Sequence, residues 1–417
     1  MIKKLQHSNR VQLLKKILLI SIYVVFGLYC FYIPSFSYRY PLNYIGYPLV
    51  FILFILVILY VVLFEKIRID IRHLLFPCFV LFALLSTILG SKSIREWITL
   101  LLLSVTYFIT ILLYDISPNK KVILNILYLS LLLFAFYFLV VYFKDLLNFK
   151  NIKFLRLGEK FANVNIVAGY FVSGAAIGFY YILFFRTKTR FIHILPFSLF
   201  LVLGVATGSR SFFLSAIFIL LFLLFFKFKK KKILFLGIVL SIIVTLIVLI
   251  NLPFMNTMKN RFLDMFSTLY GGDKIEGSTV ERTVWQKFAF YLGLKNLFIG
   301  HGMGGFAVFS GVGVFSHSNL FEVFCNFGIT GFFLYHSIWF LSFLYYSKSK
   351  NSDKVLALVL LSTYLLRSLF NVYYYNKISS VELSLFLCMC FDRNYSFFFI
   401  PSPRRDAILK EIITIEV

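Results

Sequence analysis

Uninterrupted apolar runs recur along the whole chain, and they constrain its fold more than any other feature. A run of about twenty such residues crosses the hydrocarbon core of a bilayer as one α-helix. Because 60% of the 417 residues are hydrophobic and only 14% are charged, a water-facing core cannot bury this apolar surface. The chain is therefore predicted to be an all-α polytopic membrane protein, which excludes a soluble enzyme, a secreted disulfide module and a disordered tail.

Twelve of these runs are candidate transmembrane helices, nine within residues 1–252 and three within 319–392. The first run follows basic residues, as in a signal peptide, but Tyr32-Ile33-Pro34 stands where a small-residue cleavage site belongs, so we expect a retained span. The runs lie near residues 17–33, 44–64, 73–90, 97–114, 122–143, 164–185, 191–207, 211–226, 233–252, 319–346, 354–373 and 378–392.

The basic residues predict how the helices are oriented in the membrane. Lys and Arg outnumber the acids by 42 to 17 and are spread over short loops, which argues against a nucleic-acid surface and for contacts with membrane lipids. With the N-terminus inside, 25 bases fall inside and 17 outside, and 11 of the outer ones lie in two long loops that are largely exempt from the charge rule. Both termini are therefore predicted to be cytoplasmic, as are the basic turn 227–232 and the tail 393–417.

The sequence contains no strong indication of a metal or another cofactor. Gly300-His301-Gly302-Met303-Gly304-Gly305 fits G-x-G-x-x-G but lacks the βαβ setting of a nucleotide site, so a tight glycine turn that approaches a ligand or the membrane is favoured. His301 and His317 have no Cys, Asp or Glu at a familiar metal-ligand spacing. The five cysteines are expected to be small membrane-embedded hydrophobes: Cys30, Cys78, Cys325, Cys388 and Cys390.

Two long loops are predicted to be extracytoplasmic. Segment 144–163 is basic, which indicates either lipid headgroups or an anionic substrate as its partner. Segment 253–318 is expected to contain an amphipathic helix that begins at a capping box, 278–281, and carries Arg282 in its first two turns. Its apolar face is predicted to lie on the outer membrane surface. That face holds Trp285, Phe288 and Leu292.

Two outward-facing polar groups are candidates for chemistry. Arg210 lies in a turn between two helices, either as a headgroup anchor or as a guanidinium directed at a phosphate. His317 precedes a helix and is either an interfacial histidine or a base, with Glu322 one to two turns deeper. Arg367 and Glu382 are the main candidates for intramembrane charge elsewhere.

Several segments, taken in order, resemble the O-antigen ligase and polymerase superfamily. They are 156–170, 207–211, 281–285, 296–306, 317–322 and 327–331, and together they extend over roughly residues 150–335. The resemblance implies a GT-C-like fold and an inverting, metal-independent glycosyltransferase. Such enzymes use polyprenyl-pyrophosphate-linked sugars on the outer side of the bacterial cytoplasmic membrane.

The same resemblance implies roles for individual residues. Arg210 and Arg282 would hold the donor pyrophosphate, and His317 would assist at the reacting centre with Glu322 as a further candidate. The family histidine is often followed directly by Asn, whereas Ser318 intervenes here before Asn319. The residues expected to bind substrate are Arg156, Asn165, Ser209 and Asn319.

The predicted function is polymerisation of polyprenyl-pyrophosphate-linked oligosaccharide repeat units into a capsular or O-antigen polysaccharide. Within the same class, the alternative is a ligase that transfers finished glycan to another acceptor. Alternatives of another class are a lipid-linked oligosaccharide flippase or a non-catalytic scaffold. The expected partners are the lipid-linked oligosaccharide, membrane lipids, and a chain-length regulator and flippase of the same pathway, with no nucleic acid.

Overall fold

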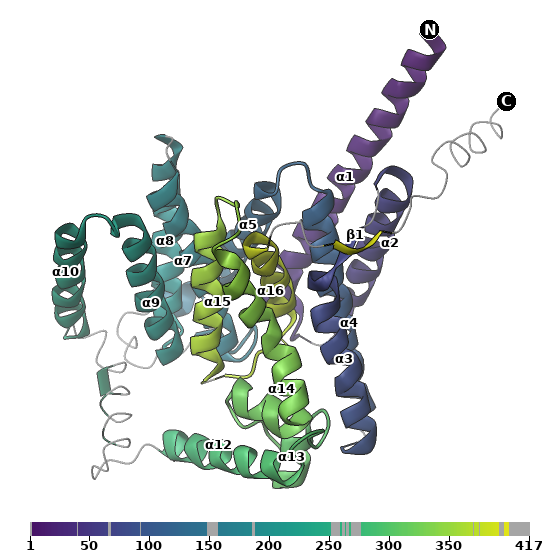
Figure 1. The fold of residues 1–417 in the computed structure, drawn as a ribbon. Coiled ribbons are helices and arrows are strands. Elements are labelled where there is room, and N and C mark those ends of the chain that lie inside the picture. Colours follow the sequence, from purple (N-terminus) through teal and green to yellow (C-terminus); the bar gives the residue numbers. More distant parts are fainter. Residues whose placement is uncertain are drawn as a thin grey trace.

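The computed structural model shows a helical bundle with helices α12 and α13 set across one end (Figure 1). It describes residues 2–39, 41–65, 68–91, 93–147, 157–185, 188–251, 259–260, 263, 267, 277–369, 371–374, 376–391 and 396–399. In these ranges the chain is helical apart from one two-stranded sheet. The predicted class, an all-α polytopic membrane protein, is confirmed.

Each of the twelve apolar runs forms a helix. These helices are α1 (Ile2–Phe36), α2 (Gly46–Phe64), α3 (Ile71–Leu89), α4 (Ile94–Ile116), α5 (Lys121–Val141), α7 (Val164–Phe184), α8 (Ile194–Ala206), α9 (Arg210–Phe228), α10 (Lys232–Ile250), α14 (Asn319–Tyr346), α15 (Lys354–Ser368) and α16 (Lys377–Cys390). The remaining elements are α6 (Phe143–Leu147), α12 (Gly277–Lys295), α13 (Gly305–Ser310), η1 (Leu42–Ile45), η3 (Lys188–His193), β1 (Arg68–Asp70) and β2 (Ser396–Phe399).

Nine helices in the described ranges are long and apolar enough to cross a membrane, against about twelve predicted. They are α1 to α5, α7, α8 together with η3, α9 and α14. The other three runs fall short of that length: α15 has 15 residues, α16 has 14, and the described apolar part of α10 spans Lys232–Val244. All five cysteines are free, as expected.

Two of the expected spans differ from simple continuous helices. The run 319–346 is interrupted at Gly328, whose φ of +62° and ψ of −168° are non-helical. A side chain there would collide with the backbone of Phe298, so only glycine fits. The run 354–373 stops at Ser368, and the residues after it form a turn that contacts the start of α14.

Helices α7 and α16 form the centre of the bundle. Every residue of α16 except its first is buried. Most of α7 is buried as well, and its small residues allow neighbouring helices to approach closely: a side chain at Gly174 would collide with the Phe200 ring of α8. Close backbone approach at small residues is the usual way in which membrane helices gain packing energy.

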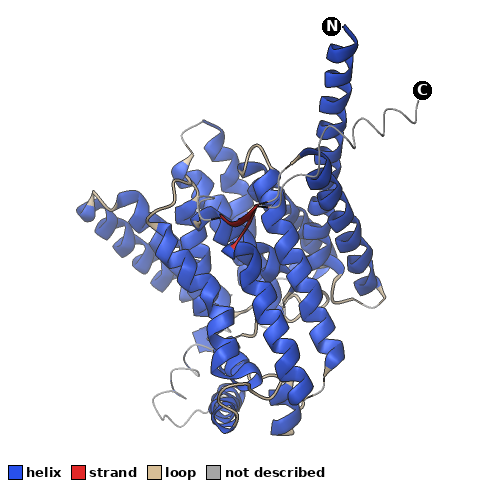
Figure 2. Ribbon diagram, turned by 45° about the vertical axis from the view of Figure 1, so that its right-hand side comes forward, coloured by secondary structure: helices blue, strands red, loops and turns tan. Residues whose placement is uncertain are grey.

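The two ends of the bundle bring together different sets of loops. At one end Lys121 lies 4.0 Å from Asp353, the Asn351 amide donates to the Tyr114 hydroxyl at 2.6 Å, and β1 pairs antiparallel with β2. Figure 2 shows this sheet toward the end of the bundle from which the N-terminal part of α1 extends. The strand β2 lies in the expected tail 393–417, which is therefore not a simple extension of the last helix.

The opposite end collects the loops that were predicted to be outside. Arg39 donates through Nε to the Lys160 carbonyl at 2.7 Å, and Ser91 donates through Oγ to the Met303 carbonyl at 2.5 Å. The Lys377 ammonium lies 3.4 Å from the Ser37 carbonyl. Loops far apart in sequence thus meet at the end that carries α12 (Figure 1).

Helix α12 corrects one expectation. Its predicted apolar face packs on protein rather than on the membrane surface, because Phe288 lies edge-on to Phe306 of α13, and Leu292 is buried with Phe306 and Cys325 of α14. The helix begins at Gly277, one residue before the predicted capping box. Packing places Arg282 and Trp285 beside the start of α14.

Candidate active site

His317 has an unusual backbone conformation just before α14. Its φ of +61° makes it the only non-glycine residue with a positive φ in the described part of the chain. Such a conformation costs on the order of 1–3 kcal/mol and persists only where the surrounding contacts impose it. Strained residues of this kind concentrate at functional sites, so the geometry marks His317 as a candidate independently of its chemistry.

Glu322 and Asn326 hold the turn that contains His317. The fully buried Glu322 carboxylate accepts a hydrogen bond from the Ser316 backbone N–H at 2.7 Å and another from the Asn326 amide at 3.2 Å. Asn326 in turn accepts from the Phe306 N–H at 2.9 Å, which ties α13 to the same point. Glu322 therefore fixes the backbone on which His317 stands.

The imidazole of His317 stacks on the indole of Trp285 in α12. The ring centroids are 5.4 Å apart and the planes differ by 17°. Burial, together with the positive charge of Arg282, lowers the pKa of His317 to about 4. The imidazole is therefore neutral at neutral pH and carries a nitrogen lone pair that can accept a proton.

The glycine turn 300–305 fastens α12 and α14 to α3. Gly300, Gly302 and Gly304 all have positive φ, and Gly302 donates through its backbone to the Asn326 carbonyl at 2.6 Å. The prediction of a tight glycine turn is confirmed, but its close neighbours are the backbones of α3 and α14. His301 contacts the Leu292 carbonyl through Nε2 at 2.9 Å, so this histidine supports α12.

A second polar cluster lies where α7 and α9 begin. Asn163 caps α7 by accepting from the Asn165 N–H at 3.0 Å. Ser209 is the N-cap residue of α9 and donates through Oγ to Asn165 Oδ1 at 2.8 Å. Arg210 is the first residue of α9, directly after this contact. Because a helix N-terminus carries partial positive charge, the two helix starts and Arg210 together favour an anion.

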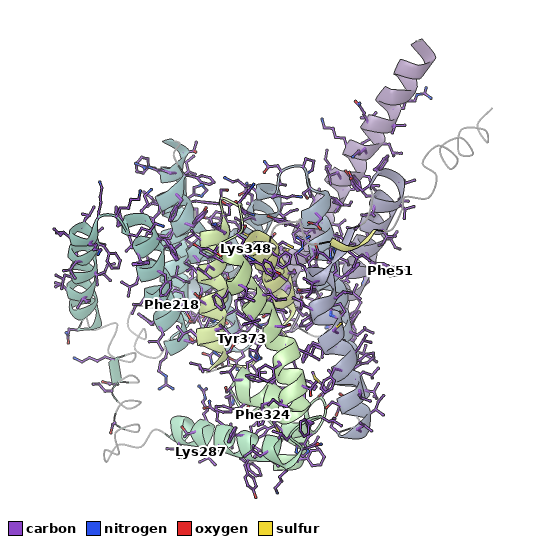
Figure 3. All side chains as sticks on the ribbon, viewed as in Figure 1. Phe51, Phe218, Lys287, Phe324, Lys348 and Tyr373 are labelled. Atoms are coloured by element: carbon purple, nitrogen blue, oxygen red, sulfur yellow. The ribbon has the colours of Figure 1, made fainter. Side chains whose placement is uncertain are left out.

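The turn between α15 and α16 joins this cluster to the His317 turn. Arg367, in the last turn of α15, donates through Nη2 to the Asn165 carbonyl at 3.3 Å. On the other side Ser318 donates through Oγ to the Ser368 carbonyl at 3.3 Å. Figure 3 shows Tyr373 of this turn close to the end of α15 and beside α14.

Asn319, which was expected to bind substrate, is buried and makes hydrogen bonds to the backbone of the segment between α15 and α16. Its Oδ1 accepts from the N–H groups of Tyr373 and Tyr374, both at 2.8 Å, and its own N–H donates to the Asn371 carbonyl at 3.0 Å. Its side chain therefore joins α14 to the α15–α16 turn, and its predicted contact with substrate stays a prediction.

The predicted residues thus fall into two connected groups at one end of the bundle. Asn165, Ser209 and Arg210 form one, and Arg282, His317, Asn319 and Glu322 form the other. Arg156 lies outside the described residues. From the sequence, Arg367 was predicted only as an intramembrane charge, and Asn326 was not predicted at all. The one sequence signal for Arg367 was a cation at the end of an apolar run. Within the described ranges, no three His, Cys, Asp or Glu side chains are placed to hold a metal ion.

Residues 195–336 match a family model described as O-antigen ligase. The predicted resemblance to the O-antigen ligase and polymerase superfamily is confirmed. The matched range includes Ser209, Arg210, Arg282 and His317, so each group of the candidate site lies partly within it. Asn165 and Arg367 lie outside it. No curated protein matches the chain.

Proposed function

We propose that this chain is a glycosyltransferase that polymerises polyprenyl-pyrophosphate-linked oligosaccharide repeat units into a capsular or O-antigen polysaccharide. The reaction would take place at the bundle end that carries α12, on the outer face of the bacterial cytoplasmic membrane. The single observation that supports it most is the stack of a strained, neutral His317 on Trp285 with Arg282 nearby. A base and a cation side by side suit transfer from a pyrophosphate leaving group.

The donor pyrophosphate is assigned to Arg210 and Arg282. A guanidinium offers fixed N–H donors and a permanent charge, which match phosphate oxygens better than an ammonium does. The starts of α7 and α9 add partial positive charge beside Arg210. These groups would stabilise the negative charge that develops on the departing phosphate, without a metal ion.

His317 is assigned to the acceptor hydroxyl. The hydroxyl oxygen bonds to the anomeric carbon of the donor sugar from the face opposite the phosphate, and the bond from that carbon to the pyrophosphate oxygen breaks. The configuration is thereby inverted, the hydroxyl proton passes to the neutral imidazole, and the lipid pyrophosphate leaves. In this scheme Glu322 and Asn319 hold the His317 turn, whereas Asn165, Ser209 and Arg156 belong to the donor side.

The test uses purified protein and a lipid-linked repeat unit, with the ladder of product lengths as the readout. Arg210→Ala and Arg282→Ala are each expected to lower kcat by about 10²–10³-fold, the cost of losing one preorganised donor. His317→Asn is the suitable histidine variant because asparagine tolerates a positive φ, and it should abolish elongation.

Arg190→Ala is the matched control, since Arg190 is an exposed arginine in η3, which lies at the other end of the bundle. It should retain full activity. Elongation by the double variant Arg210→Ala/His317→Asn would refute the site assignment.

Ligation is the second candidate, because the matching family model is described as O-antigen ligase. A ligase would deliver finished glycan to a different acceptor through the same chemistry. A deletion strain separates the two activities: loss of a polymerase leaves single repeats, whereas loss of a ligase leaves long polymer that is not attached.

A further inference from the structure

Arg367 is a buried guanidinium in a position that the proposed chemistry does not yet use. Its side chain is 3% exposed, and its Nε has no hydrogen-bond partner among the described residues. The guanidinium lies over the rings of Tyr373, at 4.7 Å, and Tyr364, at 5.9 Å. Burial of a charge is costly unless its contacts are specific, so a function for this one is expected.

The surface of α7 is shaped to receive this guanidinium. A Cβ at Gly169 would collide with Arg367 Nη2, so a glycine at this position lets the cation lie directly against the helix. Nη2 then reaches the Asn165 carbonyl one turn earlier, at 3.3 Å. Contact with two aromatic faces and one carbonyl requires a planar group, which lysine does not have.

From Arg367 the contacts run in two directions. Toward α9, Asn165 Oδ1 accepts from Ser209 Oγ at 2.8 Å, next to Arg210. Toward α14, the Arg367 carbonyl accepts from the Asn371 N–H at 3.0 Å, and the Asn371 carbonyl accepts from the Asn319 N–H at 3.0 Å. One residue thus lies between the start of the helix that carries Arg210, which it approaches through its guanidinium, and the start of the helix that follows His317, which it approaches through its backbone carbonyl.

We propose that Arg367 is a positioning residue that fixes the separation between Arg210 at the start of α9 and His317 at the start of α14. This inference rests on the proposed function, because it assigns the two residues to the phosphate and the hydroxyl of one reaction. Transfer requires both reactants to be held in line, and a displacement of about 1 Å can cost about 100-fold in rate. Arg367 does not touch the substrate.

The first experiment compares Arg367→Lys, Gly169→Ala and Ser318→Ala in steady-state assays with the lipid-linked repeat. Arg367→Lys keeps the charge and loses the planar contact, Gly169→Ala displaces the guanidinium without changing it, and Ser318→Ala removes only the bond to Ser368. The first two should lower kcat by about 10- to 100-fold with KM changed less than about threefold, and the third should lower kcat less. Gly237→Ala is the control, because a Cβ there has nothing within 4 Å.

Each result decides the proposal. A raised KM with unchanged kcat would make Arg367 a substrate ligand, and unchanged turnover per folded molecule would make it a packing residue; either overturns positioning. Ser318→Ala removes a single hydroxyl, so it still tests the bridge if Gly169→Ala does not fold. A fall in its kcat supports the proposal, and an unchanged kcat in all variants refutes it.

A second measurement is independent of activity. Spin labels at Leu214→Cys in α9 and Lys287→Cys in α12, with Cys78→Ala to remove the exposed native thiol, report the separation of the two halves. Arg367→Lys should broaden or shift the distance distribution, and Gly237→Ala should not. An unchanged distribution would overturn the inference even in an active enzyme. If the distance distribution shifts but the protein does not transfer glycan, the role of Arg367 in fixing the distance between the helices is supported and the proposed function is refuted.

Discussion

At the scale of single residues, His317 shows how neighbouring contacts set a chemical state. Stacking on Trp285 removes its ring from water, and Arg282 disfavours a second positive charge, so its pKa falls to about 4. An unperturbed histidine, with a pKa of about 6.5, would be partly protonated at neutral pH, whereas His317 is present there almost entirely as the neutral imidazole, although this imidazole is the weaker base. Between these two pKa values the folded state binds fewer protons than the unfolded state, so this residue opposes folding more strongly as the pH falls.

Trp285→Ala is expected to raise the pKa of His317, because it exposes the imidazole to water. Wild-type kcat/KM should therefore stay level down to about pH 5, whereas the acid limb of the variant should move up toward about pH 6.5. Trp285→Phe keeps an apolar ring over the imidazole and should resemble the wild type. The measurement is the pH dependence of polymer elongation, and coincident acid limbs for alanine and phenylalanine would contradict this account.

At the scale of elements, the break in α14 decides where the site lies. Helix α14 would run straight past the loop 296–300 if Gly328 were helical; instead Ile329 donates through its N–H to the Leu297 carbonyl at 2.7 Å. Gly300 packs against the same place, since a Cβ there would collide with the backbone of Phe327 and Gly328. The two glycines let α12, α13 and the first part of α14 form one unit around His317.

Gly328→Ala should destabilise this unit more than Gly311→Ala does. Both glycines have positive φ, but a Cβ at Gly311 meets nothing within 4 Å, whereas one at Gly328 collides with the backbone of Phe298. Gly311→Ala therefore measures the conformational cost alone, about 1 kcal/mol. Thermal unfolding in detergent gives the comparison, and equal melting temperatures for the two variants would show that the close approach is unimportant.

At the scale of the whole molecule, the two ends of the bundle differ in what they bury. At the end that carries the β1–β2 sheet, Arg72 bridges Asp70 and Asp115 at 2.5 and 2.9 Å. Burial would raise the pKa of Asp70, but hydrogen bonds from His73 and Arg72 outweigh it and hold this pKa well below its usual range. That end contains these charge pairs, whereas the other end carries α12 (Figure 1), the glycine turn and the candidate site.

Single cysteines at the two ends should be labelled from opposite sides of the membrane. With Cys78 replaced, Lys287→Cys on α12 is expected to react with an impermeant thiol reagent in spheroplasts, because the charge rule places this end outside. Lys230→Cys, in the basic turn between α9 and α10, should react only after permeabilisation. Both positions are exposed, so access to the reagent is equal once the membrane is open. The reverse pattern would put the candidate site in the cytoplasm.

Features that depend on local composition could be predicted from the amino-acid sequence. The length of an apolar run predicts where a helix lies, because a bilayer solvates each transmembrane helix separately. All twelve predicted runs form helices in the structure. The candidate site was also predicted from local sequence. Arg210, Arg282 and His317 each lie in a short segment that resembles the O-antigen ligase and polymerase superfamily.

Contacts between groups that are far apart in the sequence became visible only in the folded molecule. Arg367 lies 202 residues from the Asn165 carbonyl that it contacts, and no periodicity in either segment encodes that pairing. The same holds for the apolar face of α12. The sequence of an amphipathic helix is the same whether that face covers lipid or protein, and the packing of α12 on α13 and α14 shows that it covers protein. Asn319 accepts hydrogen bonds from the backbone of Tyr373 and Tyr374, 54 and 55 residues away, whereas Glu322 bonds to the nearby Ser316 and Asn326. The roles predicted for Asn319 and Glu322 at the substrate stay predictions. Long-range hydrogen bonds depend on the relative positions of whole helices, which local sequence does not specify.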